Sequence, residues 1–345
     1  MTSMERFIAT VERRDVDRVP YVLPVMLHGA RLLGMSLEQY FADAEAVADA
    51  QLRLQRRYGH DAILSLYFAA IEHEAWGGSV RFFEDGPPNA GAPLVRSIEH
   101  IPTLRAPEIG DSPRLQKMLR SIRLMRAALG ESVPIVGAIV SPNSVPVMQL
   151  GFEAYLHVIL ERRDLYDQLM AINEPFAAAW ANAQLEAGAS MMVYFDPVAS
   201  PTILPRTLYR QTGWPVARRI IGQIKAPVAV GLASGRALPI IPDLIEAGAT
   251  AVGVSCDDDL AACKRAARTA MTVMGNLNGI AMRRWTRDEV DVQVRMAIDA
   301  AAAGGGFVLS EHHGEVPLQV PDATLMALAE AAQRWGRFPL ESAGG

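Results

Sequence analysis

The fold of this chain is indicated first by a stretch near its end, Gly304-Gly305-Gly306-Phe307-Val308-Leu309-Ser310-Glu311-His312-His313-Gly314-Glu315-Val316-Pro317. The apolar run at 307–309 predicts a short strand buried on both faces, which is typical of a parallel sheet. An acid, two adjacent histidines and a second acid follow its C-terminal end. In parallel α/β proteins that end is where ligands bind. The stretch therefore predicts both a fold class and the place of a functional site.

The size and composition of the chain fit a large folded unit. A chain of 345 residues can hold two average domains or one α/β barrel, since barrels run to about 250 residues and beyond. The hydrophobic content of 50% and the charged content of 21% are typical of a soluble globular protein with a large core. The net charge of −5 argues against nucleic acid as the main partner.

The sequence contains no recognisable membrane or targeting segment. No apolar run approaches the roughly 18–20 residues that a membrane span requires. Residues 1–6 lack the basic-then-apolar layout of a signal peptide. Two cysteines, Cys256 and Cys263, are too few for a disulfide framework. We therefore expect a cytoplasmic protein without a membrane partner.

Apolar segments alternate with helix-like segments along most of the chain. Strands are predicted at residues 19–26, 61–68, 134–141, 190–196, 227–234, 251–256, 272–276 and 307–309. Helices are predicted at residues 36–58, 113–129, 151–161, 164–187, 205–224, 239–247, 258–269, 286–303 and 321–335. Such alternation predicts parallel βα units, and eight of them favour a (β/α)8 TIM barrel of the α/β class.

The alternative architecture is an open doubly wound sheet. It is disfavoured because no Gly-rich phosphate loop follows any predicted strand. We therefore predict one barrel domain over residues 1–345. A helical extension at 4–14 precedes it, and a small insertion at 78–112, with short β-like pieces at 79–83 and 94–97, follows the second strand.

The C-terminal ends of the predicted strands would meet at one mouth of the barrel. The polar residues near these ends include His28, Glu72 or His73, Ser141, Asn143, Asp196, Ser234, Cys256 with Asp257, Asn276 with Asn278, Glu311, His312 and His313. Cysteine, histidine and carboxylates are the groups that bind Zn²⁺. The strand ends therefore predict a catalytic or metal site.

These residues also have structural interpretations. His312 and His313 would point opposite ways on an extended segment, so at most one would face the mouth, and a helix cap or surface loop is the alternative. Cys256 could be a small buried hydrophobe. Asp196 could end a strand, and Asn276 suits a tight turn.

Several segments together resemble the uroporphyrinogen decarboxylase superfamily, essentially from end to end. They are Asp17-Arg18-Val19-Pro20, Glu84-Asp85-Gly86-Pro87, Glu186-Ala187-Gly188-Ala189, Phe195-Asp196-Pro197, Gly275-Asn276-Leu277-Asn278 and residues 306–314. The resemblance implies a (β/α)8 barrel, in agreement with the strand pattern. It also implies one of two main activities.

The first activity is decarboxylation of a tetrapyrrole. Decarboxylases of this family carry a Met-Arg-Gln-Ala-Gly-Arg type segment whose arginines bind propionates, and an Asp that holds the pyrrole nitrogens. The matching segment here is Met26-Leu27-His28-Gly29-Ala30-Arg31, where only Arg31 could correspond. Leu66-Tyr67-Phe68-Ala69 has no carboxylate. Decarboxylation of uroporphyrinogen is therefore disfavoured, although a lyase acting on a tetrapyrrole stays an alternative.

The second activity is corrinoid-dependent methyl transfer. Members that alkylate a thiol use a zinc site made of His-x-Cys after strand five and Cys after strand eight, and the metal presents a thiolate. The matching positions here are Leu232-Ala233-Ser234 and His313. Two ligands are absent and the third has become a histidine, which argues against that particular pattern.

We therefore predict transfer of a methyl group from a small O-, N- or S-methyl donor to a corrinoid carrier protein. The corrinoid would belong to a partner, because the chain has no Asp-x-His-x-x-Gly cobalamin signature. A non-catalytic ligand-binding barrel is the alternative of a different class, and the resemblance also implies a homodimer. The predicted residues are His313, Glu311, Asp196 and His28 for catalysis, Arg31, Asn143, Tyr194, Ser234, Asn276 and His312 for substrate binding, and His313, Cys256 and Glu311 for zinc.

Overall fold

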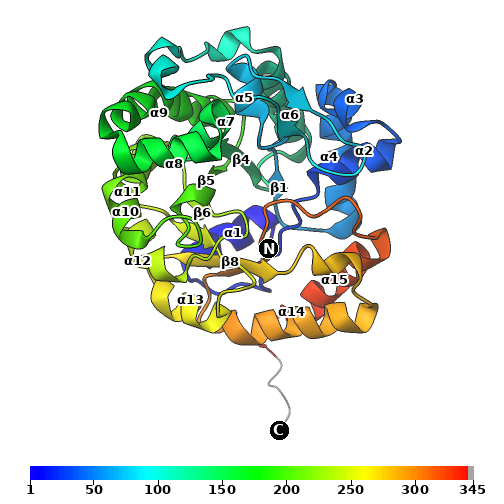
Figure 1. Cartoon of the computed structure of the whole chain (residues 1–345). Coiled ribbons are helices and arrows are strands. Elements are labelled where there is room, and N and C mark those ends of the chain that lie inside the picture. The colour runs from blue at the N-terminus through cyan, green and yellow to red at the C-terminus, as the bar shows by residue number, and fades with distance from the viewer. Residues whose placement is uncertain (341–345) are drawn as a thin grey trace.

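The fold is built around a curled sheet of seven parallel strands (Figure 1). The computed structural model describes residues 1–340. The strands lie in the order β1-β4-β5-β6-β7-β8-β9, so each adds beside the one before it. They are β1 (Ile63–Leu64), β4 (Ile135–Val140), β5 (Met191–Phe195), β6 (Val228–Gly231), β7 (Ala251–Gly253), β8 (Thr272–Leu277) and β9 (Phe307–Glu311). The predicted α/β class with a parallel sheet is confirmed.

Helices surround the sheet (Figure 1). Every residue of β4 and β9 is buried, as expected when helices cover one face and the curled sheet encloses the other. The helices are α1 (Ser3–Val11), α2 (Met26–Leu33), α3 (Leu37–Phe41), α4 (Ala44–Tyr58), α5 (Ile71–Ala75), α6 (Pro113–Leu129), α7 (Pro146–Leu150), α8 (Phe152–Glu161), α9 (Arg163–Glu186), α10 (Arg206–Gln211), α11 (Gly213–Ile221), α12 (Ile241–Glu246), α13 (Leu260–Ala267), α14 (Arg287–Ala301) and α15 (Asp322–Trp335).

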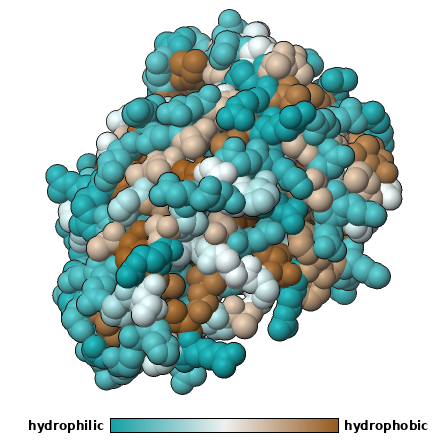
Figure 2. Space-filling model, turned by 90° about the horizontal axis from the view of Figure 1, so that it is seen from above, coloured by the Kyte–Doolittle hydropathy of each residue, from teal (hydrophilic) through white to brown (hydrophobic). Residues whose placement is uncertain are grey.

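The outer surface carries no continuous apolar area on the face seen in Figure 2. Hydrophobic residues on that face form small groups among hydrophilic ones. Within residues 1–340, none of the helices combines the length and the apolar character needed to cross a membrane.

The predicted first strand is wrong in its extent. The sheet has seven strands, and of residues 19–26 only Tyr21 forms a bridge, to Leu309 in β9. Pro20 and Pro24 have no backbone N–H to donate to a ladder, which explains the short pairing. The segment still joins the sheet edges, because Leu309 N donates to Pro20 O at 2.9 Å and Asp61 N donates to Tyr21 O at 2.8 Å.

Two long predicted helices are each divided. Residues 36–58 form α3 and α4, and residues 205–224 form α10 and α11. A capping box starts α3, since the Ser36 side chain accepts from Gln39 N and the Gln39 side chain accepts from Ser36 N. The break before α4 comes from Asp43, whose side chain accepts from Glu45 N and Ala46 N and so starts a new helix.

The segment after α5 contains a small antiparallel pair and two 3₁₀ turns. β2 (Val80–Arg81) pairs with β3 (Asn89–Ala90), and η1 (Ile98–Thr103) and η2 (Ile109–Asp111) follow. The predicted β-like piece at 94–97 forms no strand. The remaining 3₁₀ turns are η3 (Pro197–Ala199), η4 (Leu238–Ile240) and η5 (Ala281–Arg283).

A buried carboxylate connects the N-terminal helix to the sheet. Asp61 lies just before β1 and is fully buried. It accepts hydrogen bonds from Arg6 Nη1 at 2.7 Å, Arg18 Nη1 at 2.6 Å and Tyr21 N at 2.9 Å. Ser3 Oγ donates to the same carboxylate at 2.9 Å. Asp61 thereby fixes α1 and the segment around Tyr21 at the amino-terminal end of the sheet.

A second buried acid completes the edge of β4. Glu72 lies on α5, and its Oε1 accepts from Val140 N at 2.8 Å, a donor that the two-residue β1 is too short to pair. Glu72 Oε2 is buried without a hydrogen-bond partner in the described part of the chain. Burial raises the pKa of Glu72 from 4.5 to about 8, so the folded protein favours the neutral acid at neutral pH.

Removing the charge of Asp61 should strongly destabilise the fold. The change Asp61→Asn leaves Arg6 and Arg18 without their buried counter-charge, a loss worth about 3–5 kcal/mol for a broken buried pair. Urea unfolding should show this decrease in the free energy of unfolding. The exposed ion pair of Asp49 and Arg53 provides the control, because Asp49→Asn should change the free energy of unfolding by less than about 1 kcal/mol. Equal effects of the two changes would contradict the role of Asp61.

Glu72 should make stability depend on pH. The free energy of unfolding is not reduced by Glu72 at pH values below its ordinary pKa of 4.5. As the pH rises from there toward about 8, the unfolded chain releases the Glu72 proton while the folded chain keeps it, so stability falls. Glu72→Gln should therefore gain stability over the wild type between pH 5 and pH 8, by on the order of a few kcal/mol. Melting temperatures measured across this range test it, with exposed Glu84→Gln as control. A difference independent of pH would count against it.

Candidate active site

The C-terminal end of β9 turns sharply at Glu311. The carboxylate of Glu311 accepts from His313 N at 2.6 Å and from Gly314 N at 2.6 Å. The side chain is fully buried, so these bonds satisfy carboxyl oxygens that water does not reach. The chain therefore leaves the extended conformation directly after the strand.

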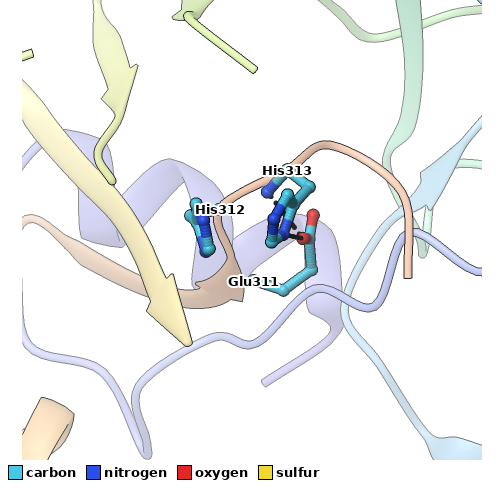
Figure 3. Close-up of side chains that lie close together, drawn as sticks. All are labelled: Glu311, His312 and His313. Atoms are coloured by element: carbon cyan, nitrogen blue, oxygen red, sulfur yellow. Dashed lines mark hydrogen bonds and ion pairs between the residues drawn. The ribbon is translucent and has the colours of Figure 1, made fainter. Parts of the chain in front are cut away.

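The turn brings the two imidazoles together (Figure 3). The rings of His312 and His313 have their centroids 3.7 Å apart and are tilted by 41°. The expectation that adjacent imidazoles would point opposite ways is wrong, because it assumed that the strand continues past Glu311. One ligand atom each from Glu311, His312 and His313 lies within 4.8 Å of the other two. We call these three residues the Glu-His-His group.

Hydrogen bonds orient the first of these imidazoles. His312 Nδ1 lies 3.0 Å from Leu277 O at the end of β8, which places the proton on Nδ1 and leaves Nε2 with a free lone pair. Nε2 lies 3.6 Å from Cys256 Sγ, beyond the end of β7. Burial, followed by the neighbouring His313, lowers the pKa of His312 and favours the neutral ring.

The second imidazole faces the carboxylate. His313 Nδ1 is 3.3 Å from Glu311 Oε2, is buried, and makes no hydrogen bond within the described residues. Two atoms that bind one zinc ion tetrahedrally at about 2.0–2.1 Å lie roughly 3.3 Å from each other. The same geometry puts a sulfur and a nitrogen ligand roughly 3.6 Å apart. The spacing of the Glu-His-His group therefore fits zinc, whereas Cys256 lies close to His312 and is not a member of the group whose ligand atoms all lie within 4.8 Å of one another.

Two cavities meet at this group. His313 lines a cleft of about 410 Å³, together with Glu315 and mostly apolar side chains. Glu311 and His312 line a smaller apolar cavity of about 90 Å³ that reaches Phe7 of α1 and includes Ser234. The turn after β9 thus separates an outer cleft from an inner chamber.

Glu315 is a residue of the cleft that the sequence-based assignment missed. Its Oε1 accepts from Leu27 N at 3.0 Å, at the start of α2. Burial, with Glu311 nearby, raises the pKa of Glu315 well above its usual range. The position of this acid, two residues after His313, indicates a place in the site, because a tight turn can keep residues two positions apart on the same side of a cavity.

Asp196 lies in a buried polar cluster. Its Oδ1 accepts from Ser141 Oγ at 2.8 Å, Asn143 Nδ2 at 3.1 Å and Ser144 Oγ at 2.6 Å. Burial raises the pKa of Asp196. Asp196, Asn143 and Tyr194 are buried, and none of them lines either cavity. Their observed contacts join the ends of β4 and β5.

The other predicted residues are spread around the mouth. His28 is buried on α2, where burial lowers its pKa to about 3, and it lines neither cavity. Arg31 Nη1 donates to Leu318 O at 2.7 Å and the side chain lines a separate cavity. Asn276 Nδ2 donates to Ser255 O at 3.0 Å. Ser234 N donates to His312 O at 3.2 Å, so Ser234 does adjoin the Glu-His-His group.

Known proteins similar to this chain include two kinds of enzyme. A methylcobamide:CoM methyltransferase, MtaA, of Methanosarcina barkeri is 22% identical, over 97% of this chain and 98% of that protein. An uroporphyrinogen decarboxylase of Xylella fastidiosa is 26% identical, over 98% of this chain and 100% of that protein. A solved methyltransferase structure from Methanosarcina mazei superimposes with a TM-score of 0.87 at 21% identity, over 96% of this chain and 98% of that chain. The last comparison shows a shared fold.

The sequence model of the family Uroporphyrinogen decarboxylase (URO-D) matches residues 2–335. This span contains every strand of the sheet and the turn that carries the Glu-His-His group. The resemblance expected from the short motifs is confirmed, and the chain belongs to the uroporphyrinogen decarboxylase family.

Proposed function

We propose that this protein transfers a methyl group from a small O-, N- or S-methyl donor to the cobalt of a corrinoid carrier protein. The observation that carries the proposal is the Glu-His-His group, of which His313 lies in the wall of an apolar cleft. The similarity to methylcobamide:CoM methyltransferases supports the broader class of corrinoid-dependent methyl transfer, although their names describe transfer from the methylated cobamide to CoM. The eight-unit barrel, with residues 19–25 in the place of a strand, would present this cleft to the carrier.

The metal proposed for this site is zinc, held by Glu311, His312 and His313. When bound, zinc would act as a Lewis acid on the atom that loses the methyl group. Cys256 is proposed as a further ligand because its Sγ lies 3.6 Å from His312 Nε2. The carbonyl of Leu277 fixes the ring of His312 in the orientation that a ligand needs.

The reaction moves the methyl group without its bonding electrons. The bond between the methyl carbon and the donor's O, N or S atom breaks, and the electron pair stays on that atom. The cobalt nucleophile of the carrier supplies the electron pair of the new bond. The atom left behind needs a proton or a Lewis acid, which is the task assigned to the Glu-His-His group. An apolar wall excludes water and strengthens this electrostatic interaction.

Tetrapyrrole decarboxylation is supported less well by the cleft. Among residues 1–340, the side chains that line it include no arginine and no lysine. Arg31 is directed to the carbonyl oxygens of Leu318 and Val320. A substrate with many carboxylates would therefore lose its hydration without gaining cationic partners.

Metal content tests the proposed ligands. Purified protein should contain about one zinc per chain, and His312→Ala and His313→Ala should each lose most of it, because three ligands are needed to hold the ion. Elemental analysis by mass spectrometry measures this. His157→Ala is the matched control, since that imidazole lies on the surface beside Glu161. Retention of zinc in both site variants would refute the assignment, and Cys256→Ser shows separately whether the thiol contributes.

Methyl transfer tests the activity. The protein should form methylated cobalt on a Co(I) corrinoid protein when supplied with a methyl donor, and the absorbance spectrum of the corrinoid reports it. His313→Ala should lower the rate by about 10²-fold or more, because it removes leaving-group activation. The surface variant His157→Ala should retain the wild-type rate. If no donor in a panel of ethers, amines and thioethers methylates the cobalt, the proposed function is wrong and a binding role becomes the better explanation.

A further inference from the structure

We infer that the cleft beside His313 is built for an uncharged aromatic methyl ether as the methyl donor. This inference deepens the proposed function and rests on it for the fate of the methyl group. The ligand class itself follows from the size, lining and charge of the cleft.

The size of the cleft indicates a ring-sized ligand. Its volume of about 410 Å³ falls within the range of about 300–1,000 Å³ that is usual for sites of drug-sized molecules. Methanol or a methylamine would fill only a small part of this space and would leave water beside the reacting atoms. A substituted benzene ring would occupy a larger share of the cleft and would displace more of that water.

The lining of the cleft suits an aromatic ring. Phe68, Phe152 and Phe195 contribute aromatic side chains, and the remaining side chains are mainly aliphatic. Aromatic pairs in edge-to-face or offset contact gain stability beyond their buried area. Phe152, the first residue of α8, is 47% exposed, and Ile203 is 37% exposed. Both line the cleft, so a bound ring would cover apolar surface that now faces water.

The charge distribution selects an uncharged ligand. No cationic side chain of the described residues lines the cleft, so a carboxylate on the ligand would be desolvated without a partner. The acid of the cleft, Glu315, already accepts a hydrogen bond from Leu27 N. A cationic ligand would lose its hydration against walls that are mostly apolar.

The position of His313 fixes the orientation of the donor. With the ring between the aromatic side chains, the ether oxygen lies toward His313 and the methyl group toward the solvent side, where the carrier can approach. On transfer, the bond from the ether oxygen to the methyl carbon breaks and the oxygen keeps the electron pair. The cobalt of the carrier forms the new bond to carbon, and the phenolate released takes a proton from solvent as it leaves.

Three probes of one shape test this inference by direct binding. They are 4-methoxybenzyl alcohol, 4-methoxybenzoate and 4-methoxybenzylamine, which are neutral, anionic and cationic at pH 7. Calorimetric titration of the full-length protein should show the alcohol binding at least about tenfold tighter than either ion, because neither charge finds a partner. Equal or tighter binding of the acid or the amine, or no binding of the alcohol, would overturn the inference.

Variants of the lining locate the ligand. Phe152→Ala should weaken binding of the alcohol about tenfold, through loss of an aromatic contact. Phe83→Ala is the matched control, because Phe83 is also 47% exposed but lines the separate cavity beside Arg31. Ile203→Lys adds a cation and should improve binding of the acid about tenfold. If Phe83→Ala weakens binding as much as Phe152→Ala, the ligand lies elsewhere.

Binding and transfer can fail independently. If the alcohol binds and its methyl group never reaches the corrinoid, the ligand class stands and the proposed function fails. If methyl transfer proceeds from a small amine or thioether while the aromatic ether does not bind, the proposed function stands and this inference fails.

Discussion

The buried carboxylate of Asp61 helps to close the gap between the two edges of the sheet. A curled parallel sheet leaves two edges, β1 and β9, whose backbone groups need partners. The chain between α1 and α2 lies across this gap, but its prolines limit how many ladder bonds it can make. Asp61 supplies what the ladder lacks by accepting from Tyr21 N and from the arginines that precede it. The segment is therefore held beside β1 largely by one buried carboxylate and beside β9 by backbone hydrogen bonds of Pro20 and Val22 with Leu309. Burial of the carboxylate requires that its cations stay in place.

A second carboxylate, that of Glu311, organises the site in a similar way. Both of its oxygens accept backbone N–H groups of the turn that follows β9. These bonds do not depend on a bound ion, so the turn by itself holds His312 and His313 beside each other. Such preorganisation lowers the free energy needed to assemble a site. Glu311 retains lone pairs for a metal because a carboxylate has about four acceptor positions.

The sequence predicted the fold more completely than it predicted the site. Alternating apolar and helical segments are local patterns, and they were sufficient for the parallel sheet. Local residues indicate both departures from the predicted elements, because Pro20 and Pro24 disfavour a full first strand and Asp43 is a good helix N-cap. The close approach of the His312 and His313 rings has no such local pattern in the sequence. It depends on where the strand ends and on which backbone N–H groups donate hydrogen bonds to the Glu311 side chain.

Asp196 illustrates the limit of reasoning from strand ends. It follows β5, and its Oδ1 accepts from three side chains of the segment between β4 and α7. Its Oδ2 is buried without a hydrogen-bond partner among the described residues, and its catalytic role stays a prediction. Spacing along the chain places a residue at the mouth, but only packing decides whether the side chain turns into a cavity or into the wall. Glu315 is the converse case: it was not among the predicted site residues, yet it lines the cleft.

The apolar cleft and the proposed ion together explain why a neutral ligand suits this chemistry. With Glu311 and two neutral imidazoles as its only protein ligands, and without a Cys256 thiolate, a bound zinc would keep a net charge of about +1. In a medium of low dielectric constant, that charge interacts strongly with an anion. A reacting atom that already carried a negative charge would gain this interaction in the ground state, which does not raise the rate. A neutral ether interacts strongly with the proposed ion only as its bond to the methyl carbon breaks and negative charge develops on the oxygen. The electrostatic stabilisation therefore acts on the transition state.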